Sequence, residues 1–348
     1  MTLSFTTSKL RKMIPSISNC LKNLDKKMVG FGTNVDSFDD SNPIVKNIKE
    51  LLGYNPNLIL VQFAPKLAKL LKLSHYKSRN ILFMRDLIDR ISQNRQQLLA
   101  NGDETEPTDF LQILINSSQD LNNDKTNDKY LTSDEMIAQC IMYFVAGYET
   151  TTKTISMVIY NIANNPDVQQ KLYEEAKQYF IENKVIEFDA IKKLKYLNAV
   201  ISETLRLYPV VPFIDRTANR DYKLGGGNDS SSSNSDAIIS GKPITVPKDT
   251  IVHIPIWSIH HDPTLFNDPE QFKPDRFLDV HHNPYAYLPF GHGQRNCPGM
   301  LYALLVIKIA VLQSVYKYKF HPSNDSLQID FIALLMVVKE VMISFEKH

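Results

Sequence analysis

The sequence has few of the features that mark secreted or nucleic-acid-binding proteins. Cysteine is rare, and the three that occur, Cys20, Cys140 and Cys297, are odd in number and far apart. This argues against a disulfide framework and favours a reducing compartment. Lys and Arg number 39 against 38 Asp and Glu, so no charge excess favours nucleic acid as a partner. The first residues lack the continuous apolar run that a signal peptide needs.

Long hydrophobic runs are also missing. No stretch reaches the roughly 18 apolar residues that a membrane span needs. The nearest candidate, residues 301–316, is interrupted by Lys308 and Gln313. We therefore expect the chain as written to be cytosolic or peripheral to a membrane.

Helical spacing dominates the chain up to residue 207. Apolar residues recur at i, i+3 and i+4 within residues 43–53, 63–73 and 75–102. The same periodicity predicts a last helix over residues 300–318.

The composition changes after residue 207. Residues 244–258, ITVPKDTIVHIPIWS, are rich in β-branched side chains and predict a hairpin of two strands. Residues 225–236, GGGNDSSSSNSD, form a low-complexity loop that cannot bury apolar surface. The sequence thus predicts one mainly α domain with small β-sheets, spanning residues 1–348, with a helical part over 1–207 and the strands within 208–348.

One expected helix, residues 133–164, carries polar residues in its middle. Thr132 and Glu135 fit a capping box at its start, and Pro166 closes it. Its central AGYETTT has two open interpretations. Either the threonine hydroxyls bond back to i−4 carbonyls on a solvated patch, or an acid–alcohol pair beside a ligand groove relays protons.

A charged pair lies in the segment NAVISETLRLYP. Glu203 and Arg206 are spaced i, i+3, and spacing alone favours an exposed pair. Their neighbours are apolar, and a buried pair would need a third charged group. Arg276, in FKPDRF, is the candidate for that group.

The segment PFGHGQRNCPGM surrounds Cys297 with glycines. Pro298 suits the first position of a helix, which would place Cys297 at a helix N-terminus and lower the pKa of its thiol. A small buried apolar residue and a redox-active thiol stay open as alternatives, whereas the spacing does not complete a zinc site. The flanking glycines favour close approach by a large flat group.

These motifs together resemble the cytochrome P450 monooxygenases of the eukaryotic microsomal type. FGHGQRNCPG, residues 290–299, is similar to the haem-thiolate signature at every fixed position, and AGYETT, ETLR and FKPDRF occur in the family's order. The resemblance implies a cytochrome P450 fold that lacks its N-terminal quarter, including the membrane anchor, the first sheet strands and the W-x-x-x-R helix. The only tryptophan, Trp257, lies elsewhere.

The resemblance also implies the site residues. Cys297 would be the axial ligand of the iron of haem b. Thr150 and Glu149 would be catalytic. Glu203, Arg206 and Arg276 would form a buried structural cluster. The remaining residues expected to contact haem are Phe290, Gly291, Gly293, Arg295, Gly299, Arg216, Ala146 and Gly147.

The activity implied is insertion of one atom of O2 into a hydrophobic substrate, with electrons from an NADPH-dependent flavoprotein reductase, at the cytosolic face of the endoplasmic reticulum. The apolar segments 137–146, 211–214 and 331–335 would contact a sterol, fatty acid or terpenoid. One alternative is a peroxide-rearranging haem-thiolate isomerase, against which Thr150 argues. The other is a non-catalytic or unstable fragment of a monooxygenase.

Overall fold

We describe the fold from a computed structural model. It describes residues 41–52, 57, 60–61, 64–74, 76–100, 109–119, 132–224, 244–278, 282–322, 326–332, 335–338 and 342–348, and before these only 11, 13–14, 17, 27–28 and 33–34. The low-complexity loop at 225–236 lies outside the described residues.

The longest helix, α7 (Ser133–Asn164), begins and ends where the sequence predicts. Its capping box is present: the Glu135 N–H donates to the Thr132 hydroxyl at 3.2 Å, and the Thr132 N–H donates to the Glu135 carboxylate at 2.8 Å. Pro166 cannot continue the ladder of α7 and instead starts the next helix, α8 (Pro166–Glu182).

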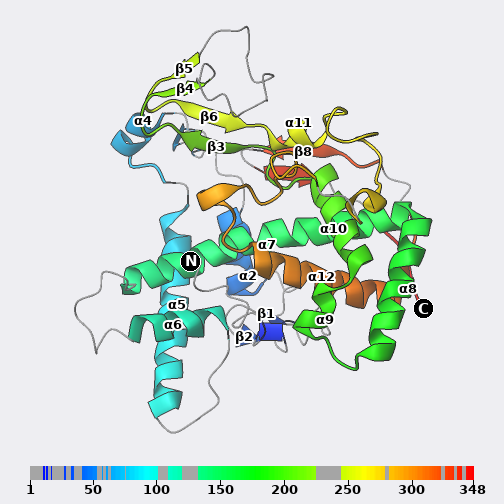
Figure 1. Ribbon diagram of the computed structural model, residues 1–348. Helices are drawn as coiled ribbons and strands as arrows, with labels where there is room; N and C mark the ends of the chain where they lie inside the picture. The colour runs from blue at the N-terminus through cyan, green and yellow to red at the C-terminus, as the bar shows by residue number, and fades with distance from the viewer. Residues whose placement is uncertain are drawn as a thin grey trace.

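The helix α12 (Met300–Lys317) runs beside α7 through the centre of the molecule (Figure 1). Both pack against α8 and α10 (Lys195–Leu207), with α9 (Phe188–Lys192) before α10. Leu172, Val200 and Leu312, from three of these helices, are fully buried in the shared core. By length and composition α12 could cross a membrane, contrary to expectation, but half of it is buried in this core and it is weak evidence of a span.

The helices predicted early in the chain are confirmed with narrower bounds. They are α2 (Pro43–Leu52), α4 (Pro65–Leu70) and α5 (Ser78–Ala100), followed by α6 (Phe110–Gln119). The end of α4 comes early because Lys72 takes a positive φ of 51° and turns the chain. A buried ion pair of 2.6 Å between Arg95 and Asp109 joins α5 to the start of α6.

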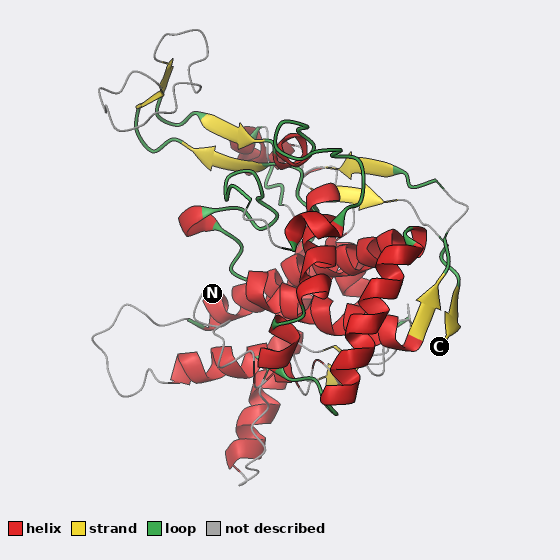
Figure 2. Ribbon diagram, turned by 45° about the vertical axis from the view of Figure 1, so that its right-hand side comes forward, coloured by secondary structure: helices red, strands yellow, loops and turns green. Residues whose placement is uncertain are grey.

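Most of the short strands lie above the helices in the view of Figure 2, and one pair lies at the right, beside the C-terminus. The described strands pair antiparallel, two by two: β1 (Lys27–Met28) with β2 (Thr33–Asn34), β3 (Ile214–Thr217) with β6 (Ile251–Ile254), β4 (Tyr222–Leu224) with β5 (Ile244–Val246), β7 (Tyr318–Phe320) with β10 (Phe345–Lys347), and β8 (Ile329–Ile332) with β9 (Leu335–Val338).

The predicted hairpin over residues 244–258 is wrong in its pairing. Its two strands, β5 and β6, form, but they pair with β4 and β3 rather than with each other. Ala218 donates to the Thr250 carbonyl at 2.9 Å and accepts from the Asp249 N–H at 2.7 Å, which holds the two ladders in one continuous ribbon. The short helix α11 (Ile256–His260) follows, then the 3-10 turns η5 (Pro274–Phe277) and η6 (Gly293–Arg295).

Candidate functional site

The cysteine loop, residues 288–299, closes on itself before α12 begins. The Cys297 N–H donates to the Phe290 carbonyl at 2.8 Å, and the Gly291 N–H donates to the Leu288 carbonyl at 3.0 Å. Gly291 and Gly293 take φ of 71° and 80°, which other residues rarely adopt. The loop therefore depends on glycine at two positions to bring its ends together around Cys297.

The helix after the loop begins at Met300, as its apolar periodicity predicts, and Pro298 is not its first residue. Pro298 and Gly299 form a turn, and α12 starts at Met300, whose N–H donates to the Cys297 carbonyl at 3.4 Å. The fixed φ of a proline suits the first position of a helix, but it does not by itself start one. Cys297 thus precedes the first helical residue by one turn instead of abutting it.

The pKa of the Cys297 thiol is raised above 9.0, so the expected lowering is wrong for the protein alone. Cys297 is exposed as a residue, but partial desolvation by the surrounding loop raises the pKa of its thiol, and this outweighs the hydrogen bonds from the backbone N–H groups of Gly299 and Met300, which lower it. The two amides still aim at the sulfur. They are placed to stabilise negative charge there once a metal takes the place of the proton.

The surroundings of Cys297 fit the haem that the resemblance implies. A Cβ placed on Gly293 or Gly147 would meet no atom within 4 Å, so both glycines border open space. A cysteine sulfur with two amide donors, in a loop whose glycines leave room for a large group, is compatible with the thiolate side of a haem centre.

Two arginines near the loop are placed to meet carboxylates. A Cβ on Gly291 would lie 3.7 Å from Ile214, the first residue of β3, and Arg216 lies two residues further along that strand. The Arg216 guanidinium donates to the adjacent Asp215 carbonyl at 2.8 Å. Within the described part of the chain, neither Arg216 nor Arg295 forms an ion pair with a carboxylate. Unpaired guanidinium groups of this kind suit the propionates of haem.

The AGYETTT motif occupies the middle of α7. The Thr150 hydroxyl donates to the Ala146 carbonyl at 2.5 Å, and Thr152 bonds back to Tyr148 in the same way at 2.6 Å. Glu149 forms an ion pair of 2.6 Å with Lys153. The back-bonding agrees with the structural interpretation of the motif, and it fixes the direction of the Thr150 hydroxyl.

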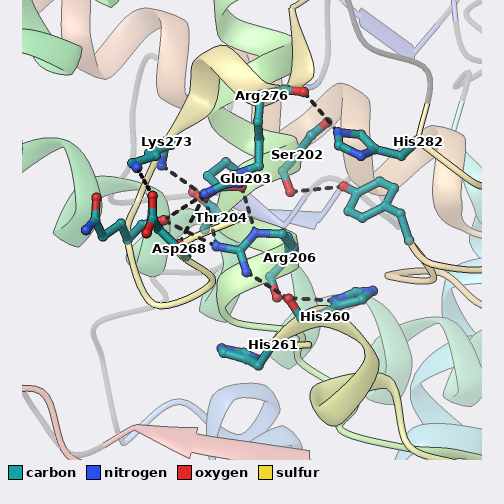
Figure 3. Close-up of polar contacts among 12 residues, drawn as sticks. Ser202, Glu203, Thr204, Arg206, His260, His261, Asp268, Lys273, Arg276 and His282 are labelled. Atoms are coloured by element: carbon teal, nitrogen blue, oxygen red, sulfur yellow. Dashed lines mark hydrogen bonds and ion pairs between the residues drawn. The ribbon is translucent and has the colours of Figure 1, made fainter. Parts of the chain in front are cut away.

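The interpretation of Glu203 and Arg206 as an exposed pair is wrong. Both side chains are completely buried, and Arg206 donates to both carboxylate oxygens of Glu203, at 2.8 and 2.9 Å. Arg276, from η5, donates to the same carboxylate at 3.1 Å, and the Lys273 N–H donates to it at 2.9 Å. Figure 3 shows Glu203 between the two guanidinium groups.

The cluster has two guanidinium groups for one carboxylate, and backbone carbonyls accept the remaining hydrogen bonds. Arg206 donates to the His260 carbonyl at 2.8 Å, and Arg276 donates to the Asn267 carbonyl at 2.9 Å. These bonds satisfy guanidinium groups that would otherwise be costly to bury. The cluster therefore pins α11 and the segment 267–276 to α10.

His260 is a buried residue that sequence reasoning missed. Its Nε2 accepts from the Leu288 N–H at 2.9 Å, so this nitrogen carries no proton, and Nδ1–H donates to the Arg206 carbonyl at 3.2 Å (Figure 3). Burial lowers the pKa of His260 to about 4. The neutral ring thereby connects the charge cluster to the first residue of the cysteine loop. The two adjacent histidines of HHDP give no sequence signal of this.

The three apolar segments expected to contact substrate differ in placement. In α7, Ile137, Ile141 and Phe144 are buried in the core. Phe331, on β8, is 48% exposed, and the neighbouring residues 333–334 lie outside the described part. The segment 211–214 leads into β3 beside the cysteine loop.

Comparison with known proteins identifies similar sequences. A family profile described as Cytochrome P450 matches residues 26–345. Cytochrome P450 3A29 of Sus scrofa is 32% identical over 361 residues, covering 93% of this chain and 67% of that protein. Cytochrome P450 3A27 of Oncorhynchus mykiss is 33% identical over 331 residues, covering 91% of this chain and 60% of that protein. Cytochrome P450 3A11 of Mus musculus is 32% identical, with 85% and 56% covered. The chain therefore spans between about half and two thirds of the length of these relatives.

Proposed function

The chain belongs to the cytochrome P450 family, and on that premise we propose that it is a haem-thiolate monooxygenase in which Cys297 would bind the haem iron as a thiolate. The observation that supports this best is the cysteine loop. It holds one sulfur in a glycine-bent ring, with two backbone N–H groups aimed at it and open space beside Gly293.

When bound, haem b would supply the iron that binds O2 and assists cleavage of the O–O bond. Cys297 would lose its proton on ligation, and the Gly299 and Met300 amides would hold the negative charge on the sulfur. Arg216 and Arg295 would bind the propionates, whose charge their unpaired guanidinium groups complement. Gly147 would leave room for the ring on the side of α7.

Glu149 and Thr150 would deliver protons. Monooxygenation of a substrate RH consumes O2, two electrons and two protons and yields ROH and water, so a proton source beside the reacting oxygen is required. The Thr150 hydroxyl is held by the Ala146 carbonyl, which fixes where its oxygen points. Glu149, partly exposed on the same helical turn, would replace from solvent each proton that Thr150 passes on.

The substrate, the electron donor and the location of the protein are part of the proposal. A hydrophobic molecule such as a sterol, fatty acid or terpenoid suits the apolar segments 137–146, 211–214 and 331–335. An NADPH-dependent flavoprotein reductase would dock on the face of the cysteine loop, on which Cys297 is exposed. The corresponding location is the cytosolic face of the endoplasmic reticulum.

The experiment supplies haem, a flavoprotein reductase, NADPH and isotopically heavy O2, with laurate, cholesterol and limonene as probes. We expect one heavy oxygen atom in the product of at least one probe, and no product from Cys297→Ser. Protein that binds stoichiometric haem yet incorporates label from none of the three classes, or that instead rearranges an added lipid peroxide, would refute the proposed monooxygenase.

A further inference from the structure

Lys153 connects the acid of the AGYETTT motif to a different part of the fold. Its ammonium group lies 2.6 Å from the Glu149 carboxylate, one helical turn earlier on α7. The same ammonium donates to the Met336 carbonyl on β9 at 2.8 Å. One side chain thus bridges α7 and the β8–β9 hairpin, across 183 residues of sequence.

The contact on β9 is made at the edge of this strand that faces away from β8. Met336 pairs with Phe331 of β8 in the ladder, and its own N–H donates to the Val210 carbonyl at 2.8 Å. Met336 is completely buried. Its carbonyl therefore depends on a protein partner, and within the described residues Lys153 is the partner observed.

An exposed i, i+4 pair would contribute little and fix nothing. The side chains of Lys153 and Glu149 are only 17% and 26% exposed, and the second contact of the ammonium, to a buried carbonyl, restricts it further. Glu149 is the acid of the proposed proton route, so a contact that orients its carboxylate bears on that route.

We propose that Lys153 is a positioning residue that fixes the Glu149 carboxylate and couples it to the β8–β9 hairpin. A substrate that moves the hairpin, through the exposed Phe331, would move Lys153 and with it the acid. This role rests on the proposed monooxygenase function. The tie between Lys153 and Met336 can nevertheless be tested without it.

The first test measures amide hydrogen exchange in the full chain. In Lys153→Met, which keeps the length and loses the charge, the amides of β8 and β9 should exchange about five-fold faster or more, because the edge loses one of its anchors. Lys153→Arg should stay within about two-fold of the original protein. The matched control is Lys171→Met on α8, whose ammonium lies 3.4 Å from exposed Asp275, and it should leave the hairpin unchanged. Unchanged hairpin exchange in Lys153→Met would overturn the proposal.

The second test compares two ways of driving laurate oxidation in haem-loaded protein. The route through O2 consumes two protons per turnover, whereas cumene hydroperoxide donates its oxygen atom to RH and leaves as the alcohol, with no net proton uptake. Lys153→Met should slow the O2 route about ten-fold and leave the hydroperoxide route within about two-fold. Lys153→Arg should recover the O2 route. An equal loss in both routes would show a merely structural role and overturn the proposal.

A double variant shows whether Lys153 acts through Glu149. Glu149→Gln should slow the O2 route alone, and adding Lys153→Met should cost less than about two-fold more. Additive losses would contradict the proposal.

Absence of a thiolate band in the ferrous carbon monoxide complex would refute the proposed function by itself. The exchange result would still decide whether Lys153 holds the hairpin.

Discussion

At the scale of single residues, His260 shows how hydrogen bonding can dictate a protonation state. Nε2 must accept from the Leu288 N–H and Nδ1 must donate to the Arg206 carbonyl, so only the neutral ring satisfies both contacts. Burial of the ring disfavours a second proton most, and the neighbouring Arg206 and His261 add to this effect. The charge cluster and the cysteine loop therefore meet at a residue that acid should disrupt.

The first prediction concerns stability against pH. The pKa of His260 falls from 6.5 to about 4 on folding, so the unfolded chain binds more protons between these values. Its contribution is fully present above pH 6.5 and is lost as the pH falls towards 4, by about 3 kcal/mol in total. Chemical denaturation across this range should show the loss. His260→Gln should flatten this part of the profile, whereas His292→Gln, in an exposed position, should not; equal profiles for all three proteins would contradict the assignment.

The second prediction concerns the buried charge cluster. Removing one partner leaves an uncompensated buried charge, at a cost of roughly 3–5 kcal/mol. Arg206→Met should lie at the upper end because the side chain is wholly buried, and Arg276→Met lower, because 12% of its side chain is exposed. The measurement is the free energy of unfolding, with Lys171→Met as the surface control. If the cluster does not stabilise the fold, both variants will have a free energy of unfolding within about 0.5 kcal/mol of the original protein.

The sequence could identify the cysteine loop, because its constraint is local: glycines, a cysteine and a proline within one short segment. It could not establish the burial of Glu203 and Arg206, since an i, i+3 pair has the same spacing inside and outside a protein. Their burial depends on Arg276 and His260, which are 73 and 54 residues distant from their partners. Only the resemblance to a family pointed to it.

At the scale of elements, the two ends of α7 were predictable because local residues determine each of them. Thr132 and Glu135 satisfy the first amides reciprocally, and Pro166 must begin a new helix. The partners of β5 and β6 were not predictable, because alternation of residue types identifies a strand and says nothing of its neighbour. Pairing across residues 225–243 is a non-local choice that the Ala218–Thr250 contact fixes.

The third prediction tests the start of α7. Thr132→Ala removes the oxygen that accepts from the Glu135 N–H and should lower stability by about 1 kcal/mol. Thr132→Ser should keep most of the stability that Thr132→Ala loses, because the hydroxyl remains. Thermal unfolding of the three proteins gives the order, and an alanine variant as stable as the serine variant would show that the cap contributes nothing.

At the scale of the whole molecule, helices α7 and α12 bring the two halves of the expected site together. The AGYETTT motif lies on one helix, and the cysteine loop leads into the other, beside it (Figure 1). The strand ribbon of β3 and β6 places Arg216 near the loop. Segments from distant parts of the chain thus lie next to the cysteine loop or to the helix that follows it.

The fourth prediction concerns haem affinity. Arg216→Ala and Arg295→Ala should each weaken haem binding about 10- to 100-fold, because each removes a charged hydrogen bond to a propionate. Neither guanidinium forms an ion pair with a carboxylate within the described residues, so the free energy of unfolding without haem should change little. Haem titration followed by absorbance gives the affinity. Arg220→Ala, which removes an arginine stacked on Tyr222 in the same region, is the control and should bind haem normally.

The central claim, that Cys297 ligates haem iron as a thiolate, is tested most directly by the absorbance spectrum of the ferrous carbon monoxide complex. We predict the strongly red-shifted Soret band of thiolate ligation for the original protein and for Cys140→Ala, whose cysteine is buried in α7. Cys297→Ser should lose the band. Haem-loaded protein without this band, or a band that persists in Cys297→Ser, would contradict the account.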